Sequence, residues 1–258
     1  MTTRTPIWRT KLCGISASVV FLTAGFLIVA WGVTAAPPVK LTNEVASPAD
    51  LTAEVVSLLA AAEQACASLE SYNERPDQLK RNAIQIAILS QALAEHETDS
   101  PQKKSAPSVR NAALALARTA SFEEAAEALP RLKEAVDGKV SGTPVVEADW
   151  GKLARASVLM PIMKQRSEAI RRALRRPKDP DAESRQAMAI ALMILAVHGD
   201  TQAVKNPADK PVWQETCLEL QGHMSRAVAA IKSKDGTAAD HFRLGMEACD
   251  KCHEKFKP

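Results

Sequence analysis

The sequence predicts an all-α protein. Of its 258 residues, 46% are hydrophobic and only 4% are aromatic, and the chain has only 10 glycines. Apolar residues recur at the three- and four-residue spacing of helices, and no segment alternates polar and apolar residues as a half-buried strand does. This composition favours helices over a β-sandwich or barrel. It also supplies enough apolar side chains for a core, which excludes a largely disordered chain.

Four helices are expected in the first half of the chain. Their apolar stripes follow a proline-containing leader and stop at residues 138–144, where Gly, Ser, Thr and Pro break the pattern. That break predicts a linker. The stripes consist of Val55, Leu58, Leu59 and Ala62; Ile84, Ile86, Ala87, Ile88, Leu89 and Leu93; Leu114 and Leu116; and Ala125, Ala126 and Leu129.

Four more helices are expected after the linker, at residues 149–176, 182–198, 210–233 and 237–257. Helices joined by short loops pack as antiparallel bundles. We therefore predict two tandem antiparallel four-helix units. Their boundaries are expected at 37–140 and 145–258.

The two halves match each other in one ungapped frame with an offset of 104 residues. Turn prolines match as well as core positions, which is harder to obtain by chance from alanine-rich helices. Chance similarity remains the alternative for the core positions. The matched pairs are Pro76 and Pro180, Asp77 and Asp181, Arg81 and Arg185, Ala83 and Ala187, Ile86 and Ile190, Ala87 and Ala191, Ala92 and Ala196, Pro107 and Pro211, Leu114 and Leu218, and Leu116 and Leu220.

Residues 1–36 have the pattern of an export signal. Residues 1–14 carry basic side chains and no acid, residues 15–33 carry no charge, and small residues at 33–36 precede two prolines. The apolar run at 15–35 is also long enough to be an uncleaved membrane anchor. In both cases the basic end stays inside, so the rest of the chain is expected to be periplasmic.

The charge balance argues against a nucleic-acid partner. The chain has 33 Lys and Arg against 30 Asp and Glu, and all three excess basic residues lie in residues 1–36. The exported part would be neutral and lacks a large positive field. One local basic cluster either ends a solvated helix or docks an acidic partner. It consists of Arg171, Arg172, Arg175, Arg176 and Lys178.

A motif near the C-terminus carries the chemistry. Cys249-Asp250-Lys251-Cys252-His253 has the Cys-x-x-Cys-His spacing that attaches c-type haem, with two thioether bonds from the thiols and an imidazole ligand for the iron. On a helix, Cys249, Cys252 and His253 project from one face. That face continues an apolar stripe, so a haem would lie inside the bundle. The stripe consists of Phe242, Met246, Cys249, His253 and Phe256.

Other interpretations of the cysteine pair have less support. A thioredoxin-like redox pair would come with a βαβ pattern, and a zinc site would need a second paired motif. A plain disulfide between positions three apart on one helix would constrain little. A helical adaptor protein with an incidental cysteine pair remains an alternative function.

The motif at the end of a four-helix unit resembles the cytochrome c-prime family, the class II c-type cytochromes. The resemblance covers roughly residues 148–258 and is strongest at the motif. It implies one haem c bound through Cys249 and Cys252, with His253 on the iron. It also implies an arginine near a propionate, matched by Arg155, and a bulky residue facing the iron, matched by Leu159. Leucine cannot ligate iron, so the resemblance implies a five-coordinate, mostly high-spin centre that binds NO or CO, or carries electrons.

Two features depart from that family pattern. Pro161 removes a helical hydrogen bond and is expected to bend the distal helix. Met160 and Met163 flank the site, where either could be a sixth ligand that makes a low-spin electron carrier, or both could be core filler.

The first half lacks the motif and is expected to be haem-free. Members of the family commonly pair as homodimers, so we expect this half to pack on the second as a pseudo-dimer within one chain. Its cysteine, Cys66, is expected to be buried, and a disulfide to Cys217 is a further possibility in an oxidising compartment.

The sequence therefore predicts an exported cytochrome that transfers electrons or binds a small gas, and no enzyme. Its partner would be a redox protein or a diatomic gas. A haem peroxidase-like enzyme is the alternative, and a polar distal base or arginine would favour it.

Overall fold

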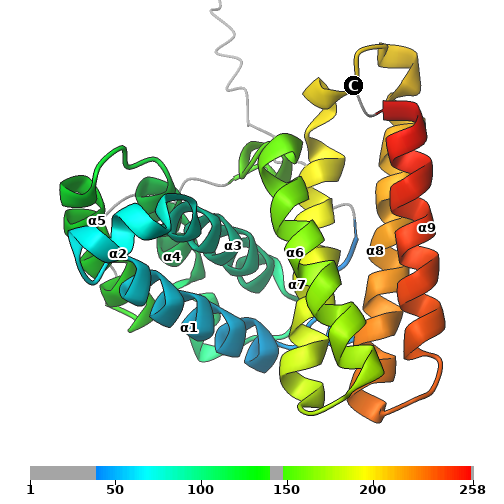
Figure 1. The fold of residues 1–258 in the computed structure, drawn as a ribbon, viewed down its shortest axis with the longest axis horizontal. Helices are drawn as coiled ribbons and strands as arrows, with labels where there is room; N and C mark the ends of the chain where they lie inside the picture. The colour runs from blue at the N-terminus through cyan, green and yellow to red at the C-terminus, as the bar shows by residue number, and fades with distance from the viewer. Residues whose placement is uncertain (1–38, 140–147, 257–258) are drawn as a thin grey trace, which may run out of the picture. The chain divides into compact units, whose positions relative to one another are not determined.

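Helices make up all the regular secondary structure that the computed structural model describes, which covers residues 39–139 and 148–256. No strand occurs in these residues, which confirms the predicted all-α class (Figure 1). The expected signal or anchor, with its apolar run at 15–35, lies outside the described residues. Among the helices that are described, none combines the length and the apolar character needed to cross a bilayer.

The first half has the four expected helices and one short helix that no stripe indicated. The short helix, α2, begins at the capping side chain of Ser68 and has 6 residues, too few to show a helical period. The helices are α1 (Pro48–Ala65), α2 (Leu69–Glu74), α3 (Pro76–Glu95), α4 (Ala106–Ala117) and α5 (Phe122–Val136), with a 3-10 turn, η1, at Pro101–Lys103.

The second half has the four helices expected there, and the first of them starts later than predicted. Asp149 accepts a hydrogen bond from the Gly151 amide and begins a 3-10 turn, and Arg155 is extended. The α-helix then runs on through Pro161. The elements are η2 (Trp150–Lys152), α6 (Ala156–Arg175), α7 (Pro180–Gly199), η3 (Thr201–Ala203), η4 (Pro207–Asp209), α8 (Lys210–Ser233) and α9 (Ala238–Phe256).

The repeat frame matches the starts of four helices. α3 and α7 each start at the proline of the matched Pro-Asp pair, and each has 20 residues. α4 and α8 start at Ala106 and Lys210, which are offset by the same 104 residues. α3 and α7 also contact each other. The equivalent helices of the two halves therefore meet in the middle of the fold.

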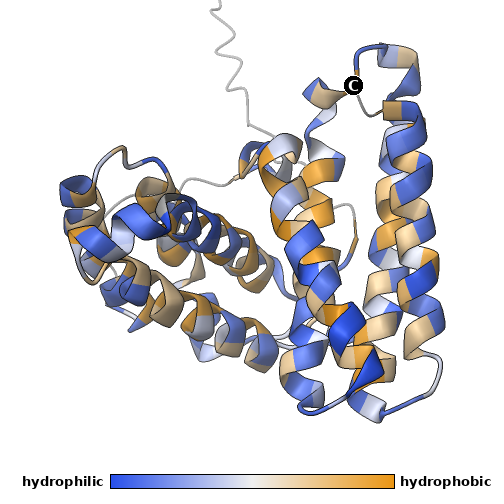
Figure 2. Cartoon of the chain, in the orientation of Figure 1, coloured by the Kyte–Doolittle hydropathy of each residue, from blue (hydrophilic) through white to orange (hydrophobic). Residues whose placement is uncertain are grey.

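Helix α7 lies between the two halves and contacts helices of both. Every residue from Ala187 to Val197 is buried, and α7 contacts α1 and α3 of the first half as well as α6 and α8 of the second. A helix that is apolar all round is one buried on all sides. Figure 2 shows this contrast, with hydrophobic residues along α7 and mixed faces on α8 and α9. The halves thus pack on each other through apolar side chains, and the likeness of this packing to a homodimer of the family stays a prediction.

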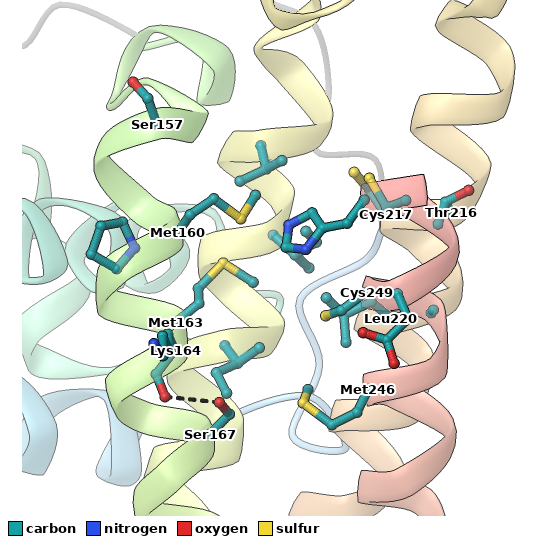
Figure 3. Close-up of a pocket in the computed structure, with 18 of the residues that line it drawn as sticks. Ser157, Met160, Met163, Lys164, Ser167, Thr216, Cys217, Leu220, Met246 and Cys249 are labelled. Carbon is teal, nitrogen blue, oxygen red and sulfur yellow. Dashed lines mark hydrogen bonds between the residues drawn. The ribbon is translucent and has the colours of Figure 1, made fainter. Parts of the chain in front are cut away.

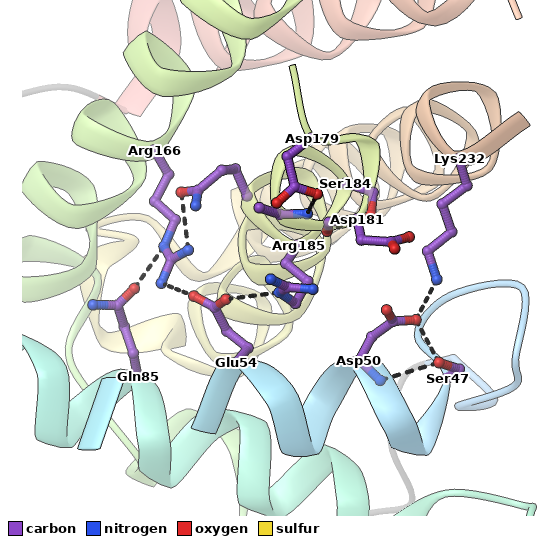
Figure 4. A network of polar contacts seen from close by, with 12 residues as sticks. Ser47, Asp50, Glu54, Gln85, Arg166, Asp179, Asp181, Ser184, Arg185 and Lys232 are labelled. Atoms are coloured by element: carbon purple, nitrogen blue, oxygen red, sulfur yellow. Dashed lines mark hydrogen bonds and ion pairs between the residues drawn. The ribbon is translucent and has the colours of Figure 1, made fainter. Parts of the chain in front are cut away.

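A buried ionic network crosses from the first half to the second (Figure 4). Glu54 of α1 forms ion pairs with Arg166 of α6 at 2.7 Å and with Arg185 of α7 at 3.4 Å. Arg166 also donates hydrogen bonds to Gln85 at 2.7 Å and to Gln186 at 3.0 Å. These partners compensate the cost of burying the Glu54 and Arg166 charges.

Two glycines allow the segment before α6 to lie against the end of α7. A Cβ built on Gly151 would lie 2.4 Å from the carbonyl carbon of Gly199, and a Cβ on Gly199 would lie 2.7 Å from the Cα of Gly151. Real Cβ atoms do not approach backbone this closely, so neither glycine can gain a side chain without a shift of the chain.

Candidate functional site

A cavity of about 600 Å³ lies inside the second half, between α6, α7, α8 and α9 (Figure 3). Ligand sites in proteins commonly have volumes of about 300–1,000 Å³. Most of the lining is aliphatic or sulfur-containing. The lining residues are Ser157, Met160, Pro161, Met163, Lys164, Ser167 and Arg171 of α6; Ile190, Ile194 and Val197 of α7; Thr216, Cys217 and Leu220 of α8; and Met246, Ala248, Cys249, Asp250, Cys252 and His253 of α9.

The cavity exists because α6 and α9 are not packed together. Each consecutive pair, α6 with α7, α7 with α8 and α8 with α9, forms a close helix contact. The first and last helices of the bundle make no comparable contact, and both line the cavity.

The C-terminal motif lies on one wall of this cavity. Cys249, Cys252 and His253 all belong to the last two turns of α9, and all three line the cavity, as their helical spacing predicts. The two cysteines are half-buried and His253 is exposed. The wall thus presents two thiols beside an imidazole that solvent can reach.

The thiols of the site are held in their neutral form. Burial, with smaller contributions from the Cys252 and Asp250 charges, raises the pKa of Cys249 to about 12. Burial also raises the pKa of Cys252 and of Cys217, the latter with the neighbouring cysteines adding to the effect. At neutral pH these groups are thiols rather than thiolates, so they are slow nucleophiles toward nonspecific reagents.

Contacts to α8 hold the end of α9 in place. Phe256 packs edge-to-face on Trp213 with ring centroids 5.3 Å apart, and the Trp213 indole donates a 2.9 Å hydrogen bond to the Val197 carbonyl. Trp213 therefore supports the wall from behind and is not among the lining residues. Two ion pairs of 2.8 Å add to this, Lys251 with Glu219 and Lys255 with Asp209.

The opposite wall carries methionines where Leu159 was expected. Leu159 is fully buried and does not line the cavity. Met160 and Met163 do line it, and Figure 3 shows both projecting from α6. Each residue turns a helix by 100°, so a register error of one residue moves a side chain off a wall. The family-based assignment of Leu159 to the iron is not supported by this placement.

Arg155 also lies away from the cavity. It is the N-cap residue of α6, and its guanidinium donates to Asp200 at 3.2 Å and to Gln202. The basic side chains that α6 places on the lining are Lys164 and Arg171. Arg155, the expected propionate partner, is therefore engaged with Asp200 and Gln202. The family spacing did not identify Lys164 and Arg171.

Of the two cysteines considered for a disulfide, Cys217 lines the cavity and Cys66 does not. Both cysteines are buried, and both have free thiols. The basic cluster lies at the C-terminal end of α6, as predicted, where four of its members border a surface depression: Arg172, Arg175, Arg176 and Lys178.

Comparisons with known proteins identify no relative. No protein-family model, curated protein or solved structure matches this chain. The resemblance to the cytochrome c-prime family therefore stays a prediction. Within the described ranges, no group of three or more His, Cys, Asp and Glu side chains is arranged to hold a bare metal ion.

The lining suits a haem better than a bare ion. The donor set is two thiols and one imidazole on a single wall, facing an apolar space with two cations on the opposite helix. Covalent haem would use that set, with Cys249 and Cys252 bonded to the porphyrin and His253 as a ligand of the iron.

Proposed function

We propose that this protein is a c-type cytochrome that carries one haem, bonded through Cys249 and Cys252 and ligated by His253. The observation that carries the proposal is the position of this motif on one wall of an apolar cavity of about 600 Å³. When bound, the haem would supply a one-electron redox centre. The expected compartment is the periplasm, where the thiols would meet the cofactor after export.

The chain's own side chains favour electron transfer over gas binding. Met160 and Met163 line the wall opposite the motif, so a thioether is available as a sixth ligand. A filled sixth position would leave no site for a gas and would make the protein a low-spin carrier for a redox partner protein. Gas binding is the second candidate if neither sulfur reaches the iron.

Lys164 and Arg171 are suited to the propionate carboxylates. They line the cavity on α6, and the Arg171 guanidinium also lies 6.0 Å from the centre of the Phe242 ring, over its face. Among the described lining residues, α6 supplies no histidine or carboxylate as a distal base, but it does supply Arg171, so the peroxidase-like enzyme stays an alternative.

The test is to export the full chain from a host that has the c-type haem attachment machinery. We expect the purified protein to be heavier by one haem, and the haem to stay on the peptide containing residues 249–253 after acid extraction. Cys249→Ala and Cys252→Ala together should remove it, whereas Cys66→Ala, at a buried cysteine outside the cavity, should not. An unmodified C-terminal peptide in the wild type would overturn the proposal.

Optical spectra of the ferric and ferrous protein, with and without CO, then separate the two functions. A low-spin spectrum that becomes high-spin and CO-reactive in Met160→Ala or Met163→Ala assigns the sixth ligand and supports electron transfer. A high-spin, CO-reactive spectrum in the wild type supports gas binding instead. Peroxide turnover well above that of free haem would favour the peroxidase alternative.

A further inference from the structure

Haem attachment leaves one cysteine of the cavity without a role. Cys217 of α8 is 2% exposed, lines the cavity and has a free thiol. Three of the four cysteines in the described residues therefore share this cavity, and Cys66 does not. Figure 3 shows Cys217 and Cys249 on the same side of the cavity, opposite Met160 and Met163.

The pairing of α8 with α9 puts Cys217 opposite Cys252. The two helices are antiparallel neighbours, and Phe256 of α9 faces Trp213 of α8. Cys252 lies four residues before Phe256 on α9, and Cys217 lies four residues after Trp213 on α8. Because residues four apart lie on one face of a helix, the two cysteines belong to the same seam.

A second contact gives the same register from the other direction. Gly245 of α9 lies against Met224 of α8. One step of seven residues, forward along α9 and backward along α8, again leads to Cys252 and Cys217, and residues seven apart also share a face.

The backbones of α8 and α9 approach each other closely at one level of this seam. A Cβ built on Gly245 would lie 3.5 Å from the Cβ of His223 on the facing helix. Disulfides join residues whose Cβ atoms are about 3.5–4.5 Å apart. The close approach at Gly245 therefore lies in the range that a disulfide needs, about two helical turns from Cys217 and Cys252 on the same seam.

We propose that Cys217 and Cys252 form a disulfide in the haem-free chain, and that this bond blocks haem attachment until it is reduced. The exchange is slow, because only a small fraction of these cysteines is ionised. The half-buried Cys252, as its thiolate, attacks a low-molecular-weight disulfide such as glutathione disulfide, forms a mixed disulfide and releases one thiol. The second cysteine then attacks the protein sulfur of the mixed disulfide and releases the other thiol. The two protons of the cysteines end on the two released thiols, and the two electrons reduce the glutathione disulfide.

The blocking role rests on the proposed function, and the disulfide itself does not. A Cys252 sulfur bonded to Cys217 cannot form a thioether with a haem vinyl group. Reduction by a dithiol returns both cysteines to thiols and restores the complete motif.

The disulfide is tested on the full chain made without haem attachment. The protein is equilibrated with glutathione disulfide, its free thiols are alkylated, and its peptides are mapped by mass spectrometry without reduction. We expect peptides of Cys217 and Cys252 joined to each other, and Cys66 alkylated. The Cys249→Ala variant should keep the bond, Cys217→Ala should lose it, and the matched control Cys66→Ala should not change it. Complete alkylation of Cys217, or a bond solely between Cys249 and Cys252, would overturn the proposal.

The blocking role is tested by haem content after export with the attachment machinery. At equal protein yield, Cys217→Ala should carry at least about twofold more haem per chain than the wild type, because Cys252 then loses one competing partner. Equal haem content would overturn the blocking role. Absence of haem from both proteins would overturn the proposed function instead, and would leave the disulfide map unaffected. Far-UV circular dichroism of Cys217→Ala checks that the variant is folded.

Discussion

The two halves of the chain keep the same central helices and differ in their outer ones. α3 and α7 have equal lengths and matching starts, but α4 has 12 residues where α8 has 24, and α5 has 15 where α9 has 19. At 1.5 Å per residue, α8 is about 36 Å long and α4 about 18 Å. In the first half α1 contacts α5, whereas α6 and α9 have no comparable close contact and both line the cavity. The candidate site thus depends on the outer helices, and the repeat is best preserved in the central ones.

A matched pair of arginines shows what the central position changes. Arg81 of α3 pairs at 3.5 Å with Asp77, one turn earlier on the same helix and largely exposed. Its counterpart Arg185 pairs with Glu54 from the other half, beside Arg166. Arg81 thus forms an ion pair within its own helix, whereas Arg185 forms one that joins the two halves.

The largest loss of stability is expected from removing the Glu54 carboxylate, which pairs with Arg166 and Arg185. Glu54→Ala should lower the free energy of unfolding by about 3–5 kcal/mol, because it leaves the buried Arg166 charge without its partner. The measurement is urea unfolding followed by far-UV circular dichroism.

Glu63→Ala is the matched control for that change. Glu63 lies on the same helix and pairs with Lys133 at 2.7 Å, but both side chains are well exposed. Because solvent screens an exposed pair, it contributes little to stability, and this variant should unfold nearly as the wild type does. Equal losses for the two variants would show that the Glu54 network does not join the halves energetically.

A smaller loss of stability is expected from a substitution at Gly151, just before α6. Gly151→Ala places a Cβ against the backbone of Gly199, which cannot rotate away, and should cost about 1–3 kcal/mol. Gly236→Ala is the control, since a Cβ there meets nothing within 4 Å. Thermal unfolding of both variants compares them, and an unchanged Tm for Gly151→Ala would contradict the close approach.

The smallest loss of stability, which should depend on pH, is expected at the ion pair of Asp50 on α1 with Lys232 on α8. Burial alone would raise the pKa of Asp50, but hydrogen bonds from Lys232 and Ser47 and the nearby positive charges lower it below its ordinary 3.8. A carboxyl with a lowered folded pKa stabilises the protein above pH 3.8, and this contribution is lost as the pH falls through the folded pKa.

Asp50→Asn should therefore cost about 1 kcal/mol at pH 7, and the difference from the wild type should shrink below pH 3.8. Urea unfolding at several pH values measures both parts. A double-mutant cycle with Lys232→Met isolates the pair. A difference that stays constant down to pH 2 would contradict the role of this carboxylate.

The sequence predicted the helices better than it predicted which side chains face the cavity. Long apolar stripes and turn prolines located the eight main helices, since both signals are local. The C-terminal motif was found for the same reason. Leu159 and Arg155 were placed by family spacing, and both lie off the cavity because the Asp149 turn and the Asp200 contact fix where α6 begins. The Glu54 network could not be foreseen, because its members are 112 and 131 residues apart in the chain and no short-range pattern joins them.

Helix α7 makes the chain hard to divide. A cut in the linker would strip α7 of its contacts with α1 and α3, and would turn a continuous apolar helix face toward water. Such a fragment would be prone to self-association, since large exposed apolar surfaces find partners. Any attempt to isolate the motif-bearing half would therefore need polar replacements along the uncovered side of this one helix.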